Sequence, residues 1–300
     1  MVTAPTQPNS VASPTLSVAQ TASPPRSTPP SSPSAWKMYL QQQQEAYRTS
    51  PKKPYRNFLI YGDPGVGKTR TAETAVSPVL YWSFDPNGTT SLVKSIESGR
   101  VIVDTRFEGG DYQHTGMSML DQTMSKLERS GMFDVIGTLY VDSITMWGES
   151  IMTEAAVQQN RGSASPYDPK GTQIQDYGMS QDALLSMLIR MCKLPCDLVV
   201  IAHAEKAVND ITGIQEVRPK FIGKVYKEML QLFDEVYYMH VQRTPGGLQR
   251  FLLTNNDGVF FARSRLASNA PIELRELPDI KAIKKKAGLP CEDLPPIQLS

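Results

Sequence analysis

The sequence has few cysteines and histidines, almost no net charge and no long apolar run. It contains three cysteines and three histidines in 300 residues. Cys192 and Cys196 have neither a second cysteine pair nor a histidine nearby, so the sequence predicts no zinc site and no disulfide framework. We expect two small core residues around a helix end instead. This cysteine usage fits a reducing cytoplasm, where we expect the protein to act.

The absence of long apolar runs and the balanced charge exclude two further classes of protein, those that span a membrane and those that wrap long stretches of nucleic acid. No apolar stretch approaches the ~18 residues of a membrane span, and no signal-like start is present, so we expect no membrane partner. The net charge of +1 excludes a strongly basic surface that wraps long stretches of nucleic acid. The net charge does not exclude a local basic groove, which is sufficient for binding single-stranded nucleic acid.

Composition divides the chain into four parts. Residues 1–34 are mostly Pro, Ser, Thr and Ala with almost no charge, which predicts a disordered tail. Residues 35–53 form a linker with a short helix, residues 54–290 form the folded domain, and residues 291–300 form a C-terminal tail. The tail at the N-terminus carries no sign of its role.

Short apolar runs alternate with helical patterns through the folded domain. We expect strands at 57–61, 79–84, 101–103, 138–141 and 197–202. We expect helices at 68–75 and 116–129, a helix after the fourth strand that runs to about residue 158, a helix from a cap at Ser180 to residue 193, and a helix at 222–232. Polar loops are expected at 159–172 and 204–221. Apolar and polar residues alternate more regularly in the runs at 235–241, 249–253 and 259–262, as they do in antiparallel strands at a sheet edge. The pattern predicts an α/β fold with a mainly parallel twisted sheet flanked by helices, and with antiparallel C-terminal edge strands.

A complete G-x-x-x-x-G-K-[ST] motif follows the first expected strand. The glycines let backbone N–H groups turn toward phosphates, and the next helix points its positive end at them. Lys68 would reach the β- and γ-phosphates and Thr69 would bind Mg²⁺, which predicts ATP and Mg²⁺ as cofactors. The expected nucleotide-binding residues are Gly62, Asp63, Pro64, Gly65, Val66, Gly67, Lys68, Thr69 and Arg70.

Three polar residues at strand ends are candidates for handling metal and water. Asp142 ends a buried strand, where such an acid holds Mg²⁺ through water. Asp85, in Phe84-Asp85-Pro86-Asn87-Gly88, is either a general base or part of a turn, and both interpretations stay open. His203 follows the fifth strand and is either a γ-phosphate sensor or a surface histidine.

Several short motifs resemble those of a known family. They are Asp142-Ser143-Ile144-Thr145, Asp176-Tyr177-Gly178, Ala202-His203, Pro219-Lys220-Phe221-Ile222-Gly223-Lys224, Phe233-Asp234 and Ala262-Arg263-Ser264-Arg265. In this order they resemble the phage RecA-like P-loop ATPases, a family of single-strand annealing and nucleotide-binding proteins with an AAA-type RecA core. The resemblance covers roughly residues 54–290 and implies a RecA-like fold. Asn87 stands where the family pattern has an acid, which implies slow hydrolysis.

The resemblance implies that the two polar loops face single-stranded DNA. Their cations would pair with phosphates, and Tyr167 and Phe221 would stack on bases. The alternative is that both are ordinary solvated loops. The candidate DNA-binding residues are Arg161, Lys170, Lys206, Arg218 and Lys220.

Arg263 and Arg265 lie two residues apart, so a strand would present both on one face. The resemblance implies that they reach the γ-phosphate of a neighbouring subunit as arginine fingers, which requires a homo-oligomer, either a ring or a filament. The alternative is a solvated edge strand. The run Lys284-Lys285-Lys286 is expected to be a solvated helix end.

Two functional hypotheses follow. The first is a phage-type ATPase, acting in the host cytoplasm, that binds single-stranded DNA and promotes annealing or recombination. The second is a nucleotide-dependent switch, or an assembly or loading factor, without direct DNA binding. The absent acid at Asn87 and the neutral overall charge favour the second. A small-molecule kinase fits poorly, because no arginine-rich lid lies between Asp142 and the fifth strand.

Overall fold

The computed structural model describes residues 32–49, 53–108, 117–158, 174–208, 213–222 and 226–298. The chain divides into two compact units, residues 1–52 and residues 53–300. The described part of the first unit is a single helix, α1 (Pro33–Thr49), where the sequence predicts a short helix. The rest of the predicted N-terminal tail lies outside the described residues.

The second unit is built on one mixed sheet, whose strand order is β10-β8-β7-β1-β5-β4-β2-β3. The strands from β7 to β3 all run parallel. Only β8 and β10 on this path are antiparallel to their neighbours, so the antiparallel edge begins one strand later than predicted. The predicted fold class is confirmed. The bounds are β1 (Asn57–Gly62), β2 (Val79–Ser83), β3 (Val101–Asp104), β4 (Thr138–Asp142), β5 (Asp197–Val208), β7 (Glu235–Thr244), β8 (Gly247–Leu253) and β10 (Arg275–Glu276).

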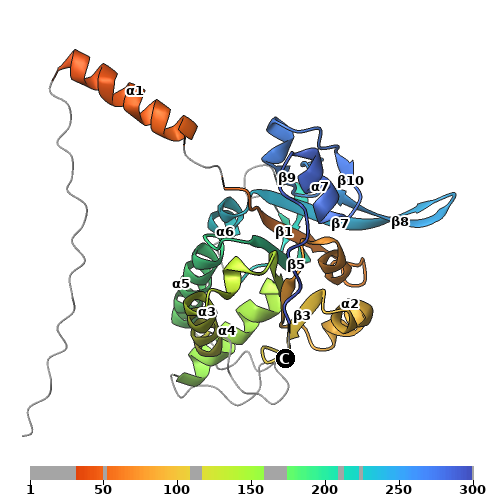
Figure 1. Cartoon of the computed structure of the whole chain (residues 1–300). Helices are drawn as coiled ribbons and strands as arrows, with labels where there is room; N and C mark the ends of the chain where they lie inside the picture. The colour runs from red at the N-terminus through yellow and green to blue at the C-terminus, as the bar shows by residue number, and fades with distance from the viewer. Residues whose placement is uncertain are drawn as a thin grey trace, which may run out of the picture. The chain divides into compact units, whose positions relative to one another are not determined.

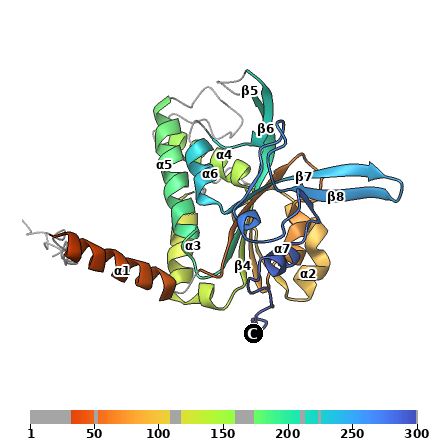
Figure 2. The same cartoon turned by 90° about the horizontal axis from the view of Figure 1, so that it is seen from above.

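Helices cover both faces of the sheet (Figures 1 and 2). One layer contains α3 (Ser118–Arg129), α4 (Ile144–Gln158), α5 (Ile174–Met191) and α6 (Tyr226–Leu232). The opposite layer contains the 3₁₀ helices η1 (Thr69–Thr74) and η2 (Gly88–Leu92) together with α2 (Val93–Glu97) and α7 (Ile280–Lys286). None of the described helices has the length and apolar character that crossing a membrane requires.

Successive residues of one strand belong to two separate cores. Leu59 packs with the layer of α3, α4 and α5, whereas its neighbours Phe58 and Ile60 pack with η1 and α7. Because side chains alternate along a strand, a strand buried on both faces needs an unbroken apolar run. This explains why the parallel strands are recognisable in the sequence.

The register brings four functional candidates to one edge of the sheet. β5 lies between β1 and β4, and Gly62 at the end of β1 is opposite His203 on β5. Asp142 at the end of β4 is opposite Ser83 on β2, two residues before Asp85. The carboxyl ends of parallel strands therefore gather the predicted site, as is general in open α/β sheets.

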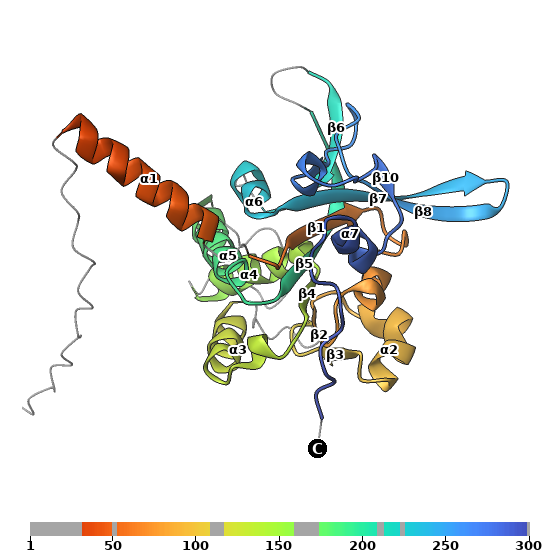
Figure 3. The same ribbon diagram turned by 45° about the horizontal axis from the view of Figure 1, so that its top comes forward.

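The predicted loop at 204–221 is wrong. β5 continues to Val208 and pairs antiparallel with β6 (Gln215–Pro219), so this segment forms a β-hairpin that projects beyond the sheet (Figure 3). His203 consequently lies within a strand and not beyond its end. The residues of this hairpin are mostly half-buried or exposed, with Ala204 and Val217 packed against the core, so the hairpin lacks the apolar pattern by which strands are detected.

Three further expectations are corrected. The helix after the phosphate motif is a six-residue 3₁₀ helix, not an α-helix over 68–75. Ser180 does not cap α5, because the helix already begins at Ile174. Instead of a strand at 259–262, the structure has one bridge at Phe260 followed by the two-residue β9 (Arg263–Ser264).

The C-terminal region packs against the domain. Lys284 is only 2% exposed and its ammonium group pairs with Asp197, so the predicted solvated lysine run is wrong at this residue. Asp293, in the predicted tail, accepts hydrogen bonds from the backbone N–H of Ser77 at 2.9 Å and from Arg100 at 2.8 Å. The amide of Leu294 donates to the Ser77 carbonyl at 2.8 Å. This segment therefore holds the residues that lead into β2.

Candidate functional site

The phosphate loop connects β1 to η1 and folds around its own lysine. The Lys68 ammonium donates to the carbonyl oxygens of Gly62 at 2.9 Å and Asp63 at 2.8 Å. Gly67 has a φ of +103°, which is strained for any residue with a Cβ. Burial lowers the pKa of Lys68, and the charges of Asp142 and the other nearby carboxylates oppose that effect.

Asp142 lies buried beside the loop. Its Oδ2 accepts hydrogen bonds from the Thr69 hydroxyl and the Tyr81 hydroxyl, both at 2.7 Å. Burial raises the pKa of Asp142 and the charge of Asp85 adds to this, while the two hydroxyl groups and Lys68 act against it. A hydroxyl and a carboxylate side by side are the hard oxygen donors that Mg²⁺ takes, mostly through water. The residues present therefore fit the predicted metal.

Asp85 belongs to a turn, one of the two alternatives that the sequence leaves open, and its side chain is directed into the site. Its carbonyl accepts from the Gly88 N–H at 3.1 Å, with Asn87 in the left-handed region at φ 61°, so the backbone forms a turn. Its side chain points into the site, where Oδ1 accepts from the Ser143 hydroxyl at 2.8 Å and Oδ2 lies 3.2 Å from Nε2 of His203. The turn thus positions the carboxylate.

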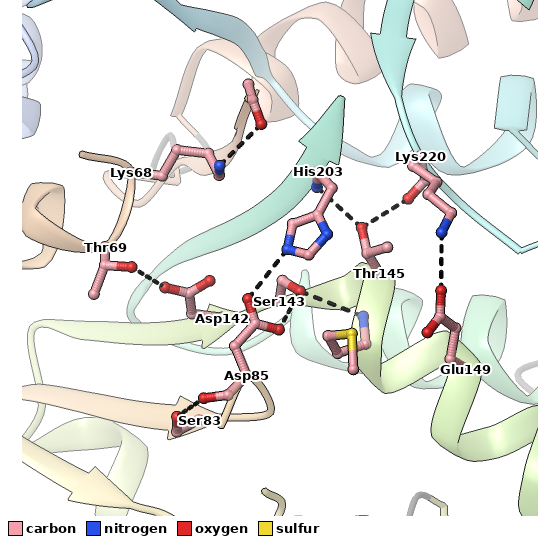
Figure 4. Close-up of polar contacts among 12 residues, drawn as sticks. Lys68, Thr69, Ser83, Asp85, Asp142, Ser143, Thr145, Glu149, His203 and Lys220 are labelled. Carbon is pink, nitrogen blue, oxygen red and sulfur yellow. Dashed lines mark hydrogen bonds and ion pairs between the residues drawn. The ribbon is translucent and has the colours of Figure 1, made fainter. Parts of the chain in front are cut away.

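Thr145 connects His203 to the β5–β6 hairpin (Figure 4). The Thr145 hydroxyl accepts from the backbone N–H of His203 at 3.0 Å and donates to the Lys220 carbonyl at 3.0 Å. The Lys220 N–H in turn donates to the His203 carbonyl at 2.8 Å. The far end of β6 is therefore fixed to the residue that faces Asp85. The sequence marks Thr145 only as part of a motif.

Two buried tyrosines support the site and were missed by the sequence analysis. Tyr81 and Tyr140 stack with ring centroids 5.1 Å apart on neighbouring strands. Tyr140 donates to the Lys68 carbonyl at 2.8 Å, and Tyr81 donates to Asp142. Burial raises the pKa of each phenol well above its ordinary value, so both stay neutral donors. In the sequence they are indistinguishable from ordinary core residues of a strand.

Arg263 and Arg265 bind their own chain. The Arg263 guanidinium donates to the carbonyls of Leu230 at 2.7 Å, in the last turn of α6, and of Phe233 at 2.8 Å, just after that helix. Arg265 pairs with Asp234 at 3.1 Å. The prediction that a strand presents both on one face is wrong, because β9 ends at Ser264 and Arg265 precedes the 3₁₀ helix η5 (Leu266–Ser268). These contacts favour a role in holding α6.

The candidate DNA-binding residues fall into three groups. Arg161, Lys170 and Tyr167 lie outside the described residues. Arg218 pairs with Glu205 at 2.8 Å and Lys220 with Glu149 at 2.9 Å, so acidic neighbours compensate both cations. Lys206 is exposed on the hairpin.

Phe221 corrects a prediction. The sequence analysis expects it to stack on bases, but it is 7% exposed and belongs to the core beneath α4 and α6. It follows directly on the β5–β6 hairpin, whose base it anchors. An aromatic residue in a polar segment predicts either role, and only the fold decides between them.

Two arginines flank the phosphate loop. Arg70, a predicted nucleotide-binding residue, is largely exposed and pairs with Glu73 at 3.1 Å. Arg250 on β8 was missed: its Nε donates to the Val66 carbonyl at 2.8 Å. Nothing in the local sequence indicates this contact, because 184 positions separate the two residues.

The phosphate loop, the buried Asp142 and the strand inserted between them define a P-loop fold of the RecA-like class. More specifically, the chain belongs to the family described as "AAA domain", whose model matches residues 55–266. None of the curated proteins matches the chain.

Solved structures with similar folds include two archaeal proteins. One is a KaiC-like protein, PH0186, from Pyrococcus horikoshii OT3, with 13% identity, a TM-score of 0.35 and coverage of 66% of this chain and 77% of that one. The other is the flagellar accessory protein FlaH from Methanocaldococcus jannaschii, with 11% identity, a TM-score of 0.39 and coverage of 77% and 88%.

Proposed function

We propose that the protein binds ATP with Mg²⁺, hydrolyses it, and uses the nucleotide state to position the β5–β6 hairpin. Lys68 binds the β- and γ-phosphates, while Thr69 and Asp142 hold the metal. The bound metal supplies positive charge that offsets the charge developing on the phosphates. The buried carboxylate beside a hydroxyl and a lysine supports this assignment.

Asp85 is the proposed general base. Its carboxylate lies at the same edge of the sheet as Asp142, and the Ser143 hydroxyl and His203 orient it from two sides. A positioned base typically contributes 10²–10⁴-fold to a proton transfer. Asn87 occupies the turn and offers no second carboxylate, which is consistent with slow turnover.

The observation that carries the proposal is the link between Asp85 and the hairpin. His203 contacts Asp85 through its ring and Lys220 through its backbone, with Thr145 bridging the two backbones. A change at the γ-phosphate that moves Asp85 therefore acts on both strands of the hairpin. Such a contiguous network supports coupling between the two sites.

We infer that the ligand of the hairpin is single-stranded DNA, bound by a homo-oligomer in annealing or recombination. Exposed Lys206 supports this role, and Arg161 and Lys170 would add to it. A phage origin and action in the host cytoplasm belong to the same inference.

A second candidate has its own support. The compensated charges of Arg218 and Lys220 and the exposure of Val208 at 58% and Ile214 at 57% favour a hairpin that binds a protein. The molecule would then be a nucleotide-dependent switch or an assembly or loading factor without DNA binding.

Binding of a labelled oligonucleotide separates the two candidates. Single- and double-stranded probes are titrated with and without ATP–Mg²⁺ across a salt series, using the full chain. The DNA candidate predicts tighter binding to single strands that weakens with salt, and a salt slope about one unit smaller in Lys206→Ala. Lys94→Ala, on α2 at the other face of the sheet, is the matched control.

The variant Lys68→Ala tests, in the same assay, whether the nucleotide site affects DNA binding at the hairpin. The DNA candidate predicts that this variant loses the effect of ATP–Mg²⁺ on the oligonucleotide. Absence of DNA binding at low salt, in protein shown to hold ATP, rejects this candidate and leaves the protein-binding switch.

A further inference from the structure

The two carboxylate oxygens of Asp142 have different surroundings. Oδ2 accepts two hydrogen bonds of 2.7 Å, one from the Thr69 hydroxyl (Figure 4) and one from the Tyr81 hydroxyl. A carboxylate oxygen has two lone-pair sites, so Oδ2 is fully engaged. Within the part of the chain that the structure describes, Oδ1 makes no hydrogen bond, and the residue as a whole is 2% exposed. Oδ1 is therefore the oxygen that is left for a metal ion or its water.

The register of the sheet places Tyr81 beside this carboxylate. β2 and β4 run parallel, with Tyr81 opposite Tyr140 and Ser83 opposite Asp142. Because alternate residues of a strand point to the same face, Tyr81 and Asp142 are diagonal neighbours on one face of the sheet. A tyrosine is long enough to bring its hydroxyl group across this diagonal to the carboxylate.

Packing fixes the phenol in this position. Tyr81 is fully buried, and its ring stacks on that of Tyr140 with a centroid distance of 5.1 Å and 13° between the ring planes. Tyr140 is held in turn by its bonds to the Lys68 carbonyl and the Thr71 hydroxyl, both at 2.8 Å. Burial and the charge of Asp142 raise the pKa of Tyr81, so the phenol stays a neutral donor. Tyr81 therefore holds Oδ2 from a fixed position.

Thr69, the other donor to Oδ2, is placed differently. It is half-buried and begins the 3₁₀ helix η1 that follows the phosphate loop. In the proposed function its hydroxyl oxygen binds the metal, so the orientation of this hydroxyl depends on the ion. Tyr81 is thus the donor that keeps Oδ2 engaged whichever way Thr69 turns.

Mg²⁺ and Ca²⁺ differ in how they use a carboxylate. Mg²⁺ requires a near-ideal octahedral shell, retains several waters and uses few carboxylate oxygens, whereas the larger Ca²⁺ takes more oxygen ligands and often binds both oxygens of one carboxylate. A carboxylate with a single free oxygen is therefore sufficient for Mg²⁺ but a poor ligand for Ca²⁺.

We propose that Tyr81 is a positioning residue that makes the site selective for Mg²⁺ over Ca²⁺, because its bond to Oδ2 leaves Asp142 one oxygen for the metal. This inference rests on the proposed binding of the metal by Thr69 and Asp142, and it adds the residue that selects the ion. Without the Tyr81 hydroxyl, Oδ2 has a free lone pair and the carboxylate can bind a larger cation through both oxygens.

Tyr237 provides a matched control at the opposite edge of the sheet. Its hydroxyl donates to Oε2 of Glu235 at 2.6 Å, and both residues are fully buried. Glu235 is the first residue of β7 and lies opposite Phe58, near the start of β1, whereas the phosphate loop follows the end of β1. Tyr237→Phe therefore removes the same kind of bond from a buried carboxylate without touching the metal site.

Equilibrium dialysis of the full chain tests the proposal, with a non-hydrolysable ATP analogue as the probe and with saturating Mg²⁺, saturating Ca²⁺ or a chelator. We expect the unaltered protein to bind the Mg²⁺ complex about tenfold more tightly than the Ca²⁺ complex, the size of one hydrogen bond to a charged group. Tyr81→Phe should lose this preference, chiefly because it binds the Ca²⁺ complex more tightly. Tyr237→Phe should keep the preference.

The outcomes separate this inference from the proposed function. If Tyr81 only supports the fold, Tyr81→Phe weakens both complexes equally and keeps the preference, which overturns the assignment. Equal binding of the two complexes by the unaltered protein also overturns it, and this result needs no variant. If the chelator leaves binding of the analogue unchanged, or if Asp142→Asn binds both complexes as the unaltered protein does, the proposed function itself fails.

Discussion

Nε2 of His203 lies 3.2 Å from Oδ2 of Asp85, although 118 positions separate the two residues in the chain. β4 lies between the strands that carry them, and Ser143, just after β4, bonds to the other oxygen of Asp85. Groups from β5 and from the end of β4 thus converge on one carboxylate in the turn after β2. In the proposed function nucleotide chemistry and hairpin position meet at this group, which makes Asp85 the first residue to alter.

Asp85→Asn is expected to slow ATP hydrolysis by about 100-fold with little change in ATP affinity. An amide retains the turn and a contact to Ser143 but accepts no proton, and a general base contributes 10²–10⁴-fold. Phosphate release in steady state and equilibrium ATP binding are the two measurements. An unchanged rate would remove Asp85 from the chemistry.

Asn87→Gly is the companion variant, because glycine tolerates the left-handed conformation at this position. If Asn87 serves only the turn, hydrolysis stays at the level of the unaltered protein. A large loss of rate with intact ATP binding would assign water orientation to Asn87 instead. The two variants together identify which residue of the turn acts on water.

Asp142→Asn is expected to raise thermal stability near neutral pH while abolishing Mg²⁺-dependent hydrolysis. Burial raises the pKa of Asp142, so the folded state binds the proton more tightly than the unfolded state does. The stability of the unaltered protein therefore falls as pH rises from the ordinary value of 3.8 through the raised pKa, and it stays reduced above it. An amide does not titrate and avoids this loss.

Scanning calorimetry without nucleotide measures the effect. A gain of ~1 kcal/mol corresponds to about 2–4 °C in Tm for a domain of this size. The difference between the two proteins should shrink as pH falls toward 4. A variant that is less stable at neutral pH would mean that the hydroxyl contacts of Asp142 outweigh its burial.

The sequence predicted the nucleotide side of the site far better than the hairpin side. The phosphate loop and Asp142 lie at the ends of strands buried on both faces, which leave an unbroken apolar signal. The β5–β6 hairpin leaves none, because most of its residues are only half-buried or exposed. Lys206 therefore appeared to lie in a loop.

Contacts between segments that lie far apart in the sequence also could not be predicted. Arg250 reaches the phosphate loop from β8, and Lys284 reaches the start of β5 from α7. Neither has a local pattern that differs from an ordinary surface cation. Arg263 and Arg265 show the reverse case, since a convincing spacing in the sequence breaks when the strand ends between them.

Lys284→Met is expected to destabilise the fold by about 3–5 kcal/mol, the usual effect of breaking a buried ion pair. The side chains of Lys284 and Asp197 are 3% and 1% exposed, so removing the lysine leaves a buried carboxylate without its cation. The double variant Lys284→Met with Asp197→Asn should recover much of the loss, because the amide oxygen still accepts from the Arg56 N–H. Denaturant unfolding of the unaltered protein, the two single variants and the double variant gives the coupling energy between Lys284 and Asp197. If the losses of the two single variants simply add in the double variant, the two residues are not coupled and the expectation is wrong.

Asp293→Asn is expected to lower stability at neutral pH and to leave it unchanged in acid. Partial burial acts to raise the pKa of Asp293, but hydrogen bonds from Arg100, Ser77 and Lys281 outweigh it and hold the pKa well below 3.8. The ionised group therefore stabilises the fold above its unfolded pKa, and this contribution disappears as pH falls through the depressed folded value. The C-terminal segment and the residues that lead into β2 should loosen together at that point.

Unfolding midpoints between pH 2 and pH 7 test this expectation, with Asp182→Asn on α5 as the control for removing one exposed carboxylate. The Asp293 variant and the unaltered protein should converge only toward the acid end, whereas the Asp182 variant should follow the unaltered protein throughout. A gap that persists at the lowest pH would show that the Asp293 contacts stabilise the fold through geometry and not through charge.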